Sequence, residues 1–480
     1  MAQCPVQMIE RLKEIVGDRA VLTDPAELIA YESDGLTEFR MPPDAVVLPR
    51  SAEQVRAVVR LCNQYDVPIV PRGAGTGLSG GCVAARGGIM IGFSRMNRIL
   101  EIDCENRVAV VEPGVLNLQL SDLTMPKGYY YAPDPSSQAA CTLGGNVAEN
   151  SGGPHCLKYG MTVNHVLGLE VVTADGDRVT LGGGAPDAVG YDLLGLFIGS
   201  EGTFGIVTKI TVRLEQTPQG VRTLLADYLG VADACRTVSD IIAAGIIPAA
   251  LELMDKRTVS TVEDSVLAAG YPRDAEAVLI IELDGYEKGL DDQASRVTHL
   301  CRKNNARSVR MALDEAERKK LWAGRKAAFG AAGRLSPDLL VQDAVVPRRR
   351  LAEILPKIYE ICDRHGVRVS NVFHAGDGNL HPNMNYDSRN PEEAARVKEA
   401  LREIMRLCVS TGGTITGEHG VGLEKIEFMD LIFGPDTLEA MRRVREVWNP
   451  KNLFNPGKVL PDPSVRAKHA PSGEPTSAAA

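Results

Sequence analysis

The first quarter of the chain alternates between helical and strand-like hydrophobic patterns. Residues 51–66 begin with a capping signal at Ser51 and then carry apolar side chains at helical spacing, which predicts a helix. The β-branched residues 67–70 predict a strand, and 88–93 and 107–111 predict two more. This mixture of periods indicates an α+β fold.

The periodic pattern stops at residues 131–160 and then resumes. That stretch is rich in Gly, Ser, Asn and Pro, which predicts a long structured loop of the kind that usually carries function. Residues 166–181 predict a strand hairpin with its turn at 175–177. Residues 199–214 predict a glycine turn that leads into a strong strand.

The pattern divides the chain into four parts. We expect an N-terminal helical segment over 1–40 and a first α+β domain over 41–216. A second α+β domain over 217–461 alternates helical segments with strands such as 277–283. The tail over 462–480 is rich in Pro, Ser and Ala, and we expect it to be disordered.

Composition narrows the class of protein. A formal net charge of −9 argues against nucleic acid as a partner, because phosphate backbones bind basic surfaces. The ten cysteines include no C-x-x-C pair, so neither a disulfide framework nor an iron–sulfur cluster is indicated. The N-terminus lacks a secretion signal, and the most apolar stretch, 241–254, is shorter than the roughly 20 residues of a membrane span. We therefore expect a cytoplasmic protein.

A glycine-rich loop at residues 71–81, PRGAGTGLSGG, is the first candidate site. Residues 75–80 match G-x-G-x-x-G, the Rossmann fingerprint of NAD enzymes, but that fold requires a helix directly afterwards. Residues 81–93 instead contain two glycines and a strand pattern. Successive backbone N–H groups of the loop would then bind phosphate themselves, the alternative being a tight structural turn.

A second glycine cluster, at 143–146 and 150–153, favours a large ligand such as a dinucleotide. With the motifs PRGAGTGLSGG, APDPSS…TLGGNVAENSGG, GSEGTFGIVTKITVRL and NPKNLFNPGKVLP, the chain resembles the vanillyl-alcohol-oxidase/PCMH flavoprotein superfamily over about 10–461. It is most similar to the FAD-linked 2-hydroxy-acid dehydrogenases of the bacterial glycolate oxidase catalytic-subunit type. D-lactate and D-2-hydroxyglutarate dehydrogenases are near relatives. The resemblance implies a PCMH-type FAD-binding domain followed by an FAD-linked oxidase C-terminal domain, whose last segment returns to the flavin.

The resemblance also implies how FAD is held. The glycine loop would wrap the pyrophosphate, the second block would line the flavin, and Asn455 would close over the ring. The loop contains no histidine, so we expect FAD to be non-covalent. The implied cofactor-binding residues are Pro71, Arg72, Gly73, Ala74, Gly75, Thr76, Gly77, Ser79, Gly80, Gly81, Pro133, Asp134, Ser137, Gly144, Gly145, Asn150, Ser151, Gly152, Tyr159, Gly160, Glu201, Gly205, Ile206 and Asn455.

Two glycine-rich segments, 374–381 and 417–422, contain three of the eight histidines. Imidazole nitrogens and a carboxylate suit a divalent ion such as zinc, although histidines that are satisfied by hydrogen bonds remain an alternative. The resemblance implies that His374, His381 and Glu418 hold the metal.

The same resemblance implies that His419 is the general base while a hydride passes to the flavin. Asp377 and Asn379 either orient the ligands or form the turn.

A substrate carboxylate needs a cation, and residues 325–334 supply Arg325, Lys326 and Arg334. Arg325 matches the carboxylate clamp of the family, and Asn383 matches a substrate-contacting position. For Lys326, plain surface charge is the alternative. Relatives that act on hydroxyglutarate carry a lysine where this chain has residues 341–343, Val-Gln-Asp. We therefore expect a short substrate, glycolate first and D-lactate second.

The electron acceptor must lie outside this chain. The resemblance implies a second flavoprotein-like subunit and an iron–sulfur subunit, with the complex peripheral at the inner face of the cytoplasmic membrane. Three alternatives stay open: a non-catalytic FAD-binding companion subunit, a flavin-free metal hydrolase and a nicotinamide-dependent reductase. A D-lactate or D-2-hydroxyglutarate dehydrogenase is the alternative within the same chemistry.

Overall fold

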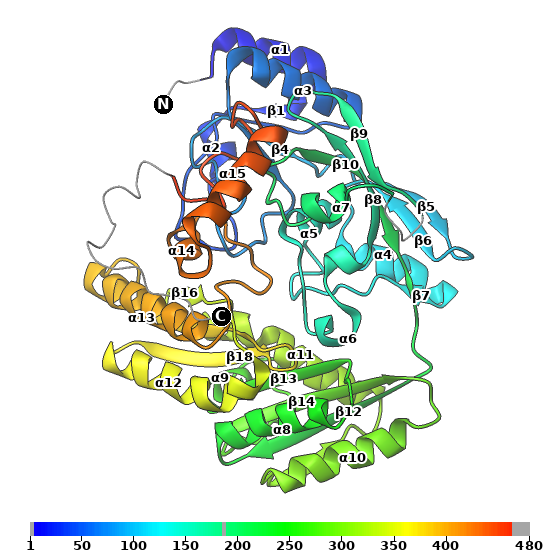
Figure 1. The fold of residues 1–480 in the computed structure, drawn as a ribbon, viewed down its shortest axis with the longest axis vertical. Helices are drawn as coiled ribbons and strands as arrows, with labels where there is room; N and C mark the ends of the chain where they lie inside the picture. The colour runs from blue at the N-terminus through cyan, green and yellow to red at the C-terminus, as the bar shows by residue number, and fades with distance from the viewer. Residues whose placement is uncertain (1–3, 185–188, 463–480) are drawn as a thin grey trace.

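The computed structural model describes residues 4–184 and 189–462 (Figure 1). The N-terminal part, with the end of the chain beside it, forms one body, and the green and yellow C-terminal part forms the other. The tail predicted to be disordered over 462–480 lies, apart from residue 462, outside the described residues. The α+β class is confirmed.

Two helices cover a four-stranded sheet in the N-terminal body. The strand order is β1-β2-β4-β3, and β2 and β3 both run parallel to β4. The predicted helix at 51–66 is confirmed, and the Ser51 hydroxyl accepts a hydrogen bond from the Gln54 N–H as its cap. The elements are α1 (Val6–Val16), α3 (Ala52–Tyr65), β1 (Val21–Leu22), β2 (Ala45–Val47), β3 (Ile69–Arg72) and β4 (Ile89–Gly92).

A second sheet of five antiparallel strands follows, in the order β5-β6-β10-β8-β9. The predicted hairpin is confirmed as β8 and β9, and the strand expected after the glycine turn at 199 is β10. Buried and half-buried side chains alternate along β10, so one of its faces packs in the core. The strands are β5 (Ile99–Asp103), β6 (Val108–Val111), β8 (Val166–Val172), β9 (Arg178–Gly182) and β10 (Ile206–Arg213).

Residues 131–160 are not the continuous loop that the composition predicts. They contain α5 (Leu143–Glu149) and the short α6 (Cys156–Tyr159). The Thr142 hydroxyl accepts a hydrogen bond from the Gly145 N–H, which caps α5 despite its two glycines. Tertiary packing and the cap outweigh the weak helix propensity of glycine here.

The C-terminal body is built on one antiparallel sheet. Its order is β15-β12-β14-β13-β18-β19-β17, and β20 joins β18 to β16. The strand predicted at 277–283 is confirmed as part of β14. The strands are β12 (Gly220–Tyr228), β13 (Ala250–Asp255), β14 (Ala277–Gly285), β15 (Ser308–Met311), β16 (Asp338–Val341), β17 (Ala344–Val345), β18 (Arg368–His374), β19 (Asn379–Leu380) and β20 (Pro382–Tyr386).

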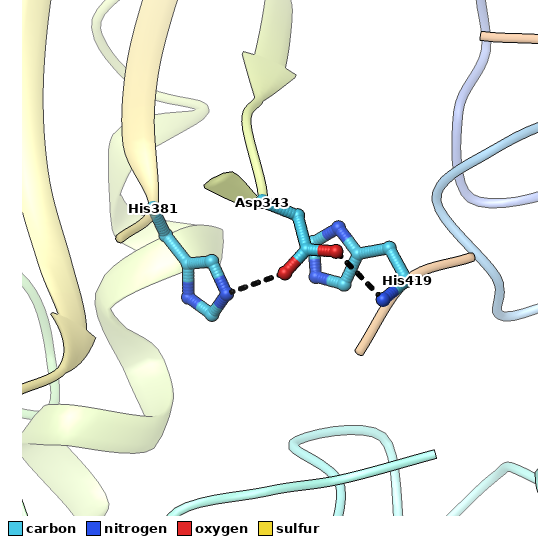
Figure 2. Close-up of side chains that lie close together, drawn as sticks. All are labelled: Asp343, His381 and His419. Carbon is cyan, nitrogen blue, oxygen red and sulfur yellow. Dashed lines mark hydrogen bonds and ion pairs between the residues drawn. The ribbon is translucent and has the colours of Figure 1, made fainter. Parts of the chain in front are cut away.

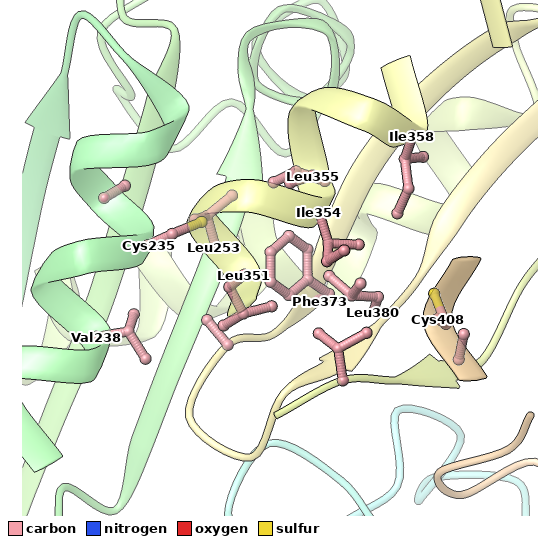
Figure 3. Packing of buried hydrophobic residues seen from close by; sticks show 14 of the residues in the cluster. Cys235, Val238, Leu253, Leu351, Ile354, Leu355, Ile358, Phe373, Leu380 and Cys408 are labelled. Carbon is pink, nitrogen blue, oxygen red and sulfur yellow. The ribbon is translucent and has the colours of Figure 1, made fainter. Parts of the chain in front are cut away.

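Helices cover both faces of this sheet, which explains why β14 is hydrophobic throughout. Leu279 and Ile281 belong to the core that holds α8, α10, α12 and α13, whereas Val278 and Ile280 belong to the core with α9 and α11. Figure 3 shows side chains of α8 and α12 meeting around Phe373 of β18. The helices are α8 (Val231–Ala243), α9 (Lys256–Glu263), α10 (Leu290–Lys303), α11 (Glu315–Ala332), α12 (Leu351–Arg364) and α13 (Pro391–Ser410).

The end of the chain returns to the N-terminal body. Helix α15 (Pro435–Trp448) leads to Phe454, which is buried in the same core as α1 and α3 and forms a parallel bridge with Ile69. The Trp448 ring stacks on Phe204. None of the helices in the described part of the chain has the length and apolar character that a membrane span needs.

Candidate active site

A cavity of about 390 Å³ lies where the glycine loop meets the C-terminal body. The loop and the second glycine block line one part of it. Lys326, Phe329, His381, Glu418 and His419 line another part. The cavity therefore brings the predicted cofactor segments and the predicted catalytic segments to one place.

The glycine loop connects two parallel strands without a helix. Chain order places it between β3 and β4, and no helix lies between residues 73 and 88. Gly75 has a φ of +73°, and a Cβ there would come within 2.2 Å of the Arg72 guanidinium. Arg72 Nη1 in turn donates to the Ser33 carbonyl at 2.8 Å. The loop is thus a compact turn folded over Arg72, and the Rossmann arrangement is excluded for this segment.

Most of the predicted cofactor-binding residues line the cavity. They come from the glycine loop, from the block that includes α5, and from the turn before β10, so the cradle is largely bare backbone of the kind that approaches a dinucleotide closely. The predicted residues that line the cavity are Pro71, Arg72, Gly73, Ala74, Gly75, Thr76, Gly77, Gly81, Ser137, Gly144, Gly145, Ser151, Gly152, Glu201, Gly205 and Ile206.

The remaining predicted cofactor residues do not line the cavity. The Asn455 side-chain amide donates hydrogen bonds to the carbonyls of Gly81 and Glu201 at 2.8 and 2.7 Å. It therefore links the glycine loop to the turn before β10. The carbonyl of Ser79 accepts the Leu423 N–H at 2.8 Å. The predicted residues outside the lining are Ser79, Gly80, Pro133, Asp134, Asn150, Tyr159, Gly160 and Asn455.

Asp134 and Tyr159 take part in contacts between the two bodies. The Tyr159 hydroxyl donates to Asp284 at 2.6 Å. His155 lies between Asp134 at 2.8 Å and Glu282 of β14 at 3.2 Å. Burial alone would lower the pKa of His155, but these two carboxylates raise it to about 10. His155 therefore serves as a charged link between the bodies and does not line the cavity.

His374, His381 and Glu418 lie together, as the resemblance implied. The Glu418 Oε1 atom is 3.2 Å from His374 Nε2 and 3.4 Å from His381 Nε2. His374 and His381 are seven residues apart in the chain, and a hairpin brings them together, because His374 ends β18 and pairs with Asn379 of β19. Gly378, with a φ of +83°, makes the turn between them possible.

The donor set fits a divalent cation. His381 is 1% exposed, and among the described residues neither of its ring nitrogens makes a hydrogen bond, although Nε2 lies at ion-pair distance from Glu418 (3.4 Å) and Asp343 (3.6 Å). A buried imidazole without a hydrogen bond favours a ligand role for His381 over the alternative of a histidine satisfied by hydrogen bonds. Two imidazoles and a carboxylate within 4.8 Å of one another match the ligands of zinc-type sites.

Glu252 supports this group and has no signal in the sequence. It is fully buried on β13, and its carboxylate accepts His374 Nδ1–H at 2.8 Å, which leaves Nε2 facing Glu418. It also accepts Arg325 Nε–H at 2.8 Å, and Arg325 Nη2 lies 2.6 Å from the same oxygen. Burial would lower the pKa of His374, but Glu252 and Glu418 raise it well above its usual value.

Arg325 and Asn383, the two predicted substrate-contacting residues, are 1% exposed and do not line the cavity. Arg325 is ion-paired with Glu252, and the side-chain oxygen of Asn383, on β20, has no hydrogen-bond partner within the described part of the chain. Lys326, the neighbouring candidate cation, lines the cavity.

Asp343 organises the loop that carries His419. Its carboxylate accepts the Thr416 hydroxyl at 2.6 Å and the N–H groups of Gly417 and His419 at 2.9 Å. Figure 2 shows Asp343 between His381 and His419. This residue belongs to the stretch 341–343 that differs from the hydroxyglutarate enzymes, but nothing in its spacing predicted its contacts with the loop.

His419 lies at the cavity beside His381. Its ring stacks on that of His381 at 5.1 Å between centroids, and its buried Nδ1 atom has no hydrogen-bond partner over residues 4–184 and 189–462. Burial lowers the pKa of His419 to about 4, so the imidazole is neutral near pH 7. Asn379 N–H bonds to Asp377 at 3.3 Å, which favours the turn interpretation for that pair.

Glu201, one of the predicted cofactor-binding residues, joins the cradle to this loop. It accepts the N–H groups of Val421 and Gly422, both at 2.7 Å. Glu149, which the sequence did not single out, also lines the cavity, and burial together with Glu201 raises the pKa of Glu149 well above its usual value. Within the second glycine block, a Cβ on Gly152 would come within 2.9 Å of Glu418. Close packing therefore joins the glycine cradle to the cluster of His374, His381 and Glu418.

Two family models match the chain. Residues 43–182 match an FAD binding domain, and residues 217–459 match the C-terminal domain of FAD linked oxidases.

Curated relatives match over nearly the whole length. Glycolate oxidase subunit GlcD of Escherichia coli K12 is 48% identical over 94% of this chain and 90% of its own, and that of Bacillus subtilis is 42% identical over 94% and 96%. D-lactate dehydrogenase of Anaerostipes hadrus is 35% identical over 94% and 97%.

Among solved structures, p-cresol methylhydroxylase with substrate bound superimposes with a TM-score of 0.80 over 94% of this chain and 96% of its own. Its identity is 19%, so this likeness concerns the fold.

Proposed function

This chain belongs to the family of FAD-linked oxidases, and from that premise we propose that it oxidises a short 2-hydroxy acid to the 2-oxo acid. FAD, when bound, supplies the acceptor for the two electrons that leave the substrate. The observation that carries the proposal is a cavity lined both by the glycine cradle and by His381, Glu418 and His419. A flavin-free hydrolase would have no use for the cradle.

Each group of residues has a distinct task in this proposal. Backbone N–H groups of the glycine loop bind the pyrophosphate of FAD. FAD is bound non-covalently in this proposal, because the loop contains no histidine and His155 is engaged by Asp134. His374, His381 and Glu418 hold a divalent metal, with zinc favoured by the ligand types, and such an ion would make a substrate hydroxyl more acidic.

His419 is the base in this proposal. Its neutral imidazole accepts the hydroxyl proton at a ring nitrogen. Arg325 and Asn383 do not line the cavity, so in this proposal they act from behind it. Arg325 shares the Glu252 carboxylate with His374 and thereby helps to position that histidine.

Glycolate is the proposed substrate, with D-lactate second. Residues 341–343 offer no lysine to a second carboxylate, and Gln342 and Asp343 are already engaged by the chain itself. The names of the GlcD relatives point the same way. D-2-hydroxyglutarate is therefore the weaker candidate.

Anaerobic addition of short D- and L-2-hydroxy acids to the flavin-loaded protein tests this function. We expect glycolate to bleach the flavin absorbance fastest, D-lactate more slowly, and D-2-hydroxyglutarate slowest. Stopped-flow absorbance gives the rates. Fastest bleaching by D-2-hydroxyglutarate would overturn the substrate order, and bleaching by reduced nicotinamide but by no hydroxy acid would identify a reductase.

Removal of the metal should slow the reaction without releasing FAD. After dialysis against a chelator we expect the flavin absorbance to remain, because no metal ligand belongs to the glycine loop, and bleaching by glycolate to fall at least about tenfold. Adding back zinc or manganese should restore it. A chelated, metal-free protein that reacts at the original rate would remove the metal from the proposal.

We further propose that this chain is the catalytic subunit of a complex with a second flavoprotein-like subunit and an iron–sulfur subunit at the inner face of the membrane. The relatives named as oxidase subunits support this, as does the absence of C-x-x-C spacing. The presence of His374, His381, Glu418 and His419 favours a catalytic chain over a companion that has lost its chemistry.

A further inference from the structure

Lys326 occupies a position that its sequence context did not distinguish. It lies on α11, and Phe329, one helical turn later, lines the same cavity. His381, Glu418 and His419 line the same cavity, and the Phe329 ring lies 6.1 Å from the His381 ring between centroids. The Lys326 side chain is exposed, so it stands at the solvent side of the cavity and not within its wall.

The neighbouring cation, Arg325, has its charge compensated. It is 1% exposed, and the fully buried carboxylate of Glu252 lies 2.6 Å from its Nη2 atom. An ion pair of this kind has little net charge to offer an incoming anion. Glu252 also receives His374 Nδ1–H, so Arg325 and the metal-ligand histidine share one counter-ion.

Lys326, by contrast, is uncompensated. No hydrogen bond or ion pair joins its ammonium group to another residue over 4–184 and 189–462. The other charged groups around the reacting end of the cavity include the carboxylates of Glu418 and Asp343. A substrate carboxylate that enters this end without a cation would meet repulsion as well as a desolvation cost.

We propose that Lys326 is the specificity-determining cation that draws the carboxylate of the 2-hydroxy acid into the cavity and holds it there. The inference rests on the proposed function. A lysine suits this task because its compact charge on a flexible stem can follow a small anion from the mouth of the cavity inward. Lys326 then contributes the net positive charge that the buried Arg325–Glu252 pair does not offer.

Oxalate binding to the flavin-loaded protein tests the proposal without turnover. Oxalate is a two-carbon anion with no hydrogen to lose, and its binding can be followed as a perturbation of the flavin spectrum. We expect Lys326→Met to raise the Kd for oxalate at least about tenfold and the KM for glycolate by a similar factor. The kcat should stay within about twofold, because a group that binds ground and transition states equally changes KM alone.

Matched variants separate charge from structure. Lys326→Arg should bind oxalate nearly as the unmodified protein does, and Lys326→Glu should bind it more weakly than Lys326→Met. Lys320→Met removes an exposed lysine from the same helix that does not line the cavity, and it should change nothing. Added salt should weaken oxalate binding in the unmodified protein more than in Lys326→Met.

Two outcomes overturn the inference, and they differ. If glycolate bleaches the unmodified protein but Lys326→Met keeps the same Kd for oxalate and the same KM, Lys326 has no role in binding the anion and the proposed function stands. If no 2-hydroxy acid bleaches the unmodified protein, the proposed function fails and this inference falls with it.

Discussion

Replacing His419 with alanine is expected to stop a 2-hydroxy acid from bleaching the flavin while FAD stays bound. The rate of flavin reduction should fall by roughly 10²-fold or more, because a positioned base contributes about 10²–10⁴ to such a step. FAD should stay because His419 belongs to the loop held by Asp343 and not to the glycine cradle. Anaerobic stopped-flow absorbance measures the rate, and the visible spectrum reports bound flavin.

His299→Ala is the matched control, since His299 is exposed on α10 and does not line the cavity. The 2-hydroxy acid should reduce the flavin of this variant at the rate measured for the unmodified protein. If His419→Ala is also reduced at the original rate, His419 is not the base. Loss of FAD from His419→Ala would instead mean that the loop helps to hold the cofactor.

Replacing Glu252 with alanine is expected to cause the largest loss of stability among single changes at the site. The change leaves the Arg325 guanidinium buried without its carboxylate, and breaking a buried pair by removing one partner costs about 3–5 kcal/mol. Urea unfolding followed by tryptophan fluorescence measures the effect. Trp322, on the same helix as Arg325, reports on the C-terminal body.

Glu276→Ala is the control for this change, because Glu276 forms a half-exposed ion pair with Lys256 in the same body. Its loss should stay within about 1 kcal/mol. Glu252→Gln keeps the volume but not the charge, and it should fall between the two. An unfolding midpoint of Glu252→Ala equal to that of Glu276→Ala would show that Arg325 needs no buried counter-ion.

Local patterns in the sequence predicted the regular elements well. The helix at 51–66, the hairpin over 166–181 and the strand after residue 199 all depend on short-range periodicity and capping, and all three are confirmed. The helix α5 was missed because its glycines have weak helix propensity, while the forces that stabilise it include packing against residues far away in the chain.

The candidate site likewise contains residues that the sequence predicted and residues that only the structure revealed. Glycine loops and histidine motifs are contiguous in the chain, so their residue types and spacing are enough to identify the segments that line the cavity. Glu252 and Asp343 have no such signal, because each is a single carboxylate on or beside a strand. The partners of Glu252 are distant: Arg325 lies 73 residues after it, and His374 lies 122 residues after it.

The sequence by itself therefore determined the family, the FAD cradle and the histidine–carboxylate motifs, since each is encoded by residues close together in the chain. Only the tertiary structure decided which of the two neighbouring cations, Arg325 or Lys326, keeps a charge that no carboxylate compensates. Arg325 and Lys326 are neighbours on one helix and have the same formal charge. Folding buries Arg325 against Glu252 and leaves Lys326 at the cavity, because successive helical side chains point in directions about 100° apart.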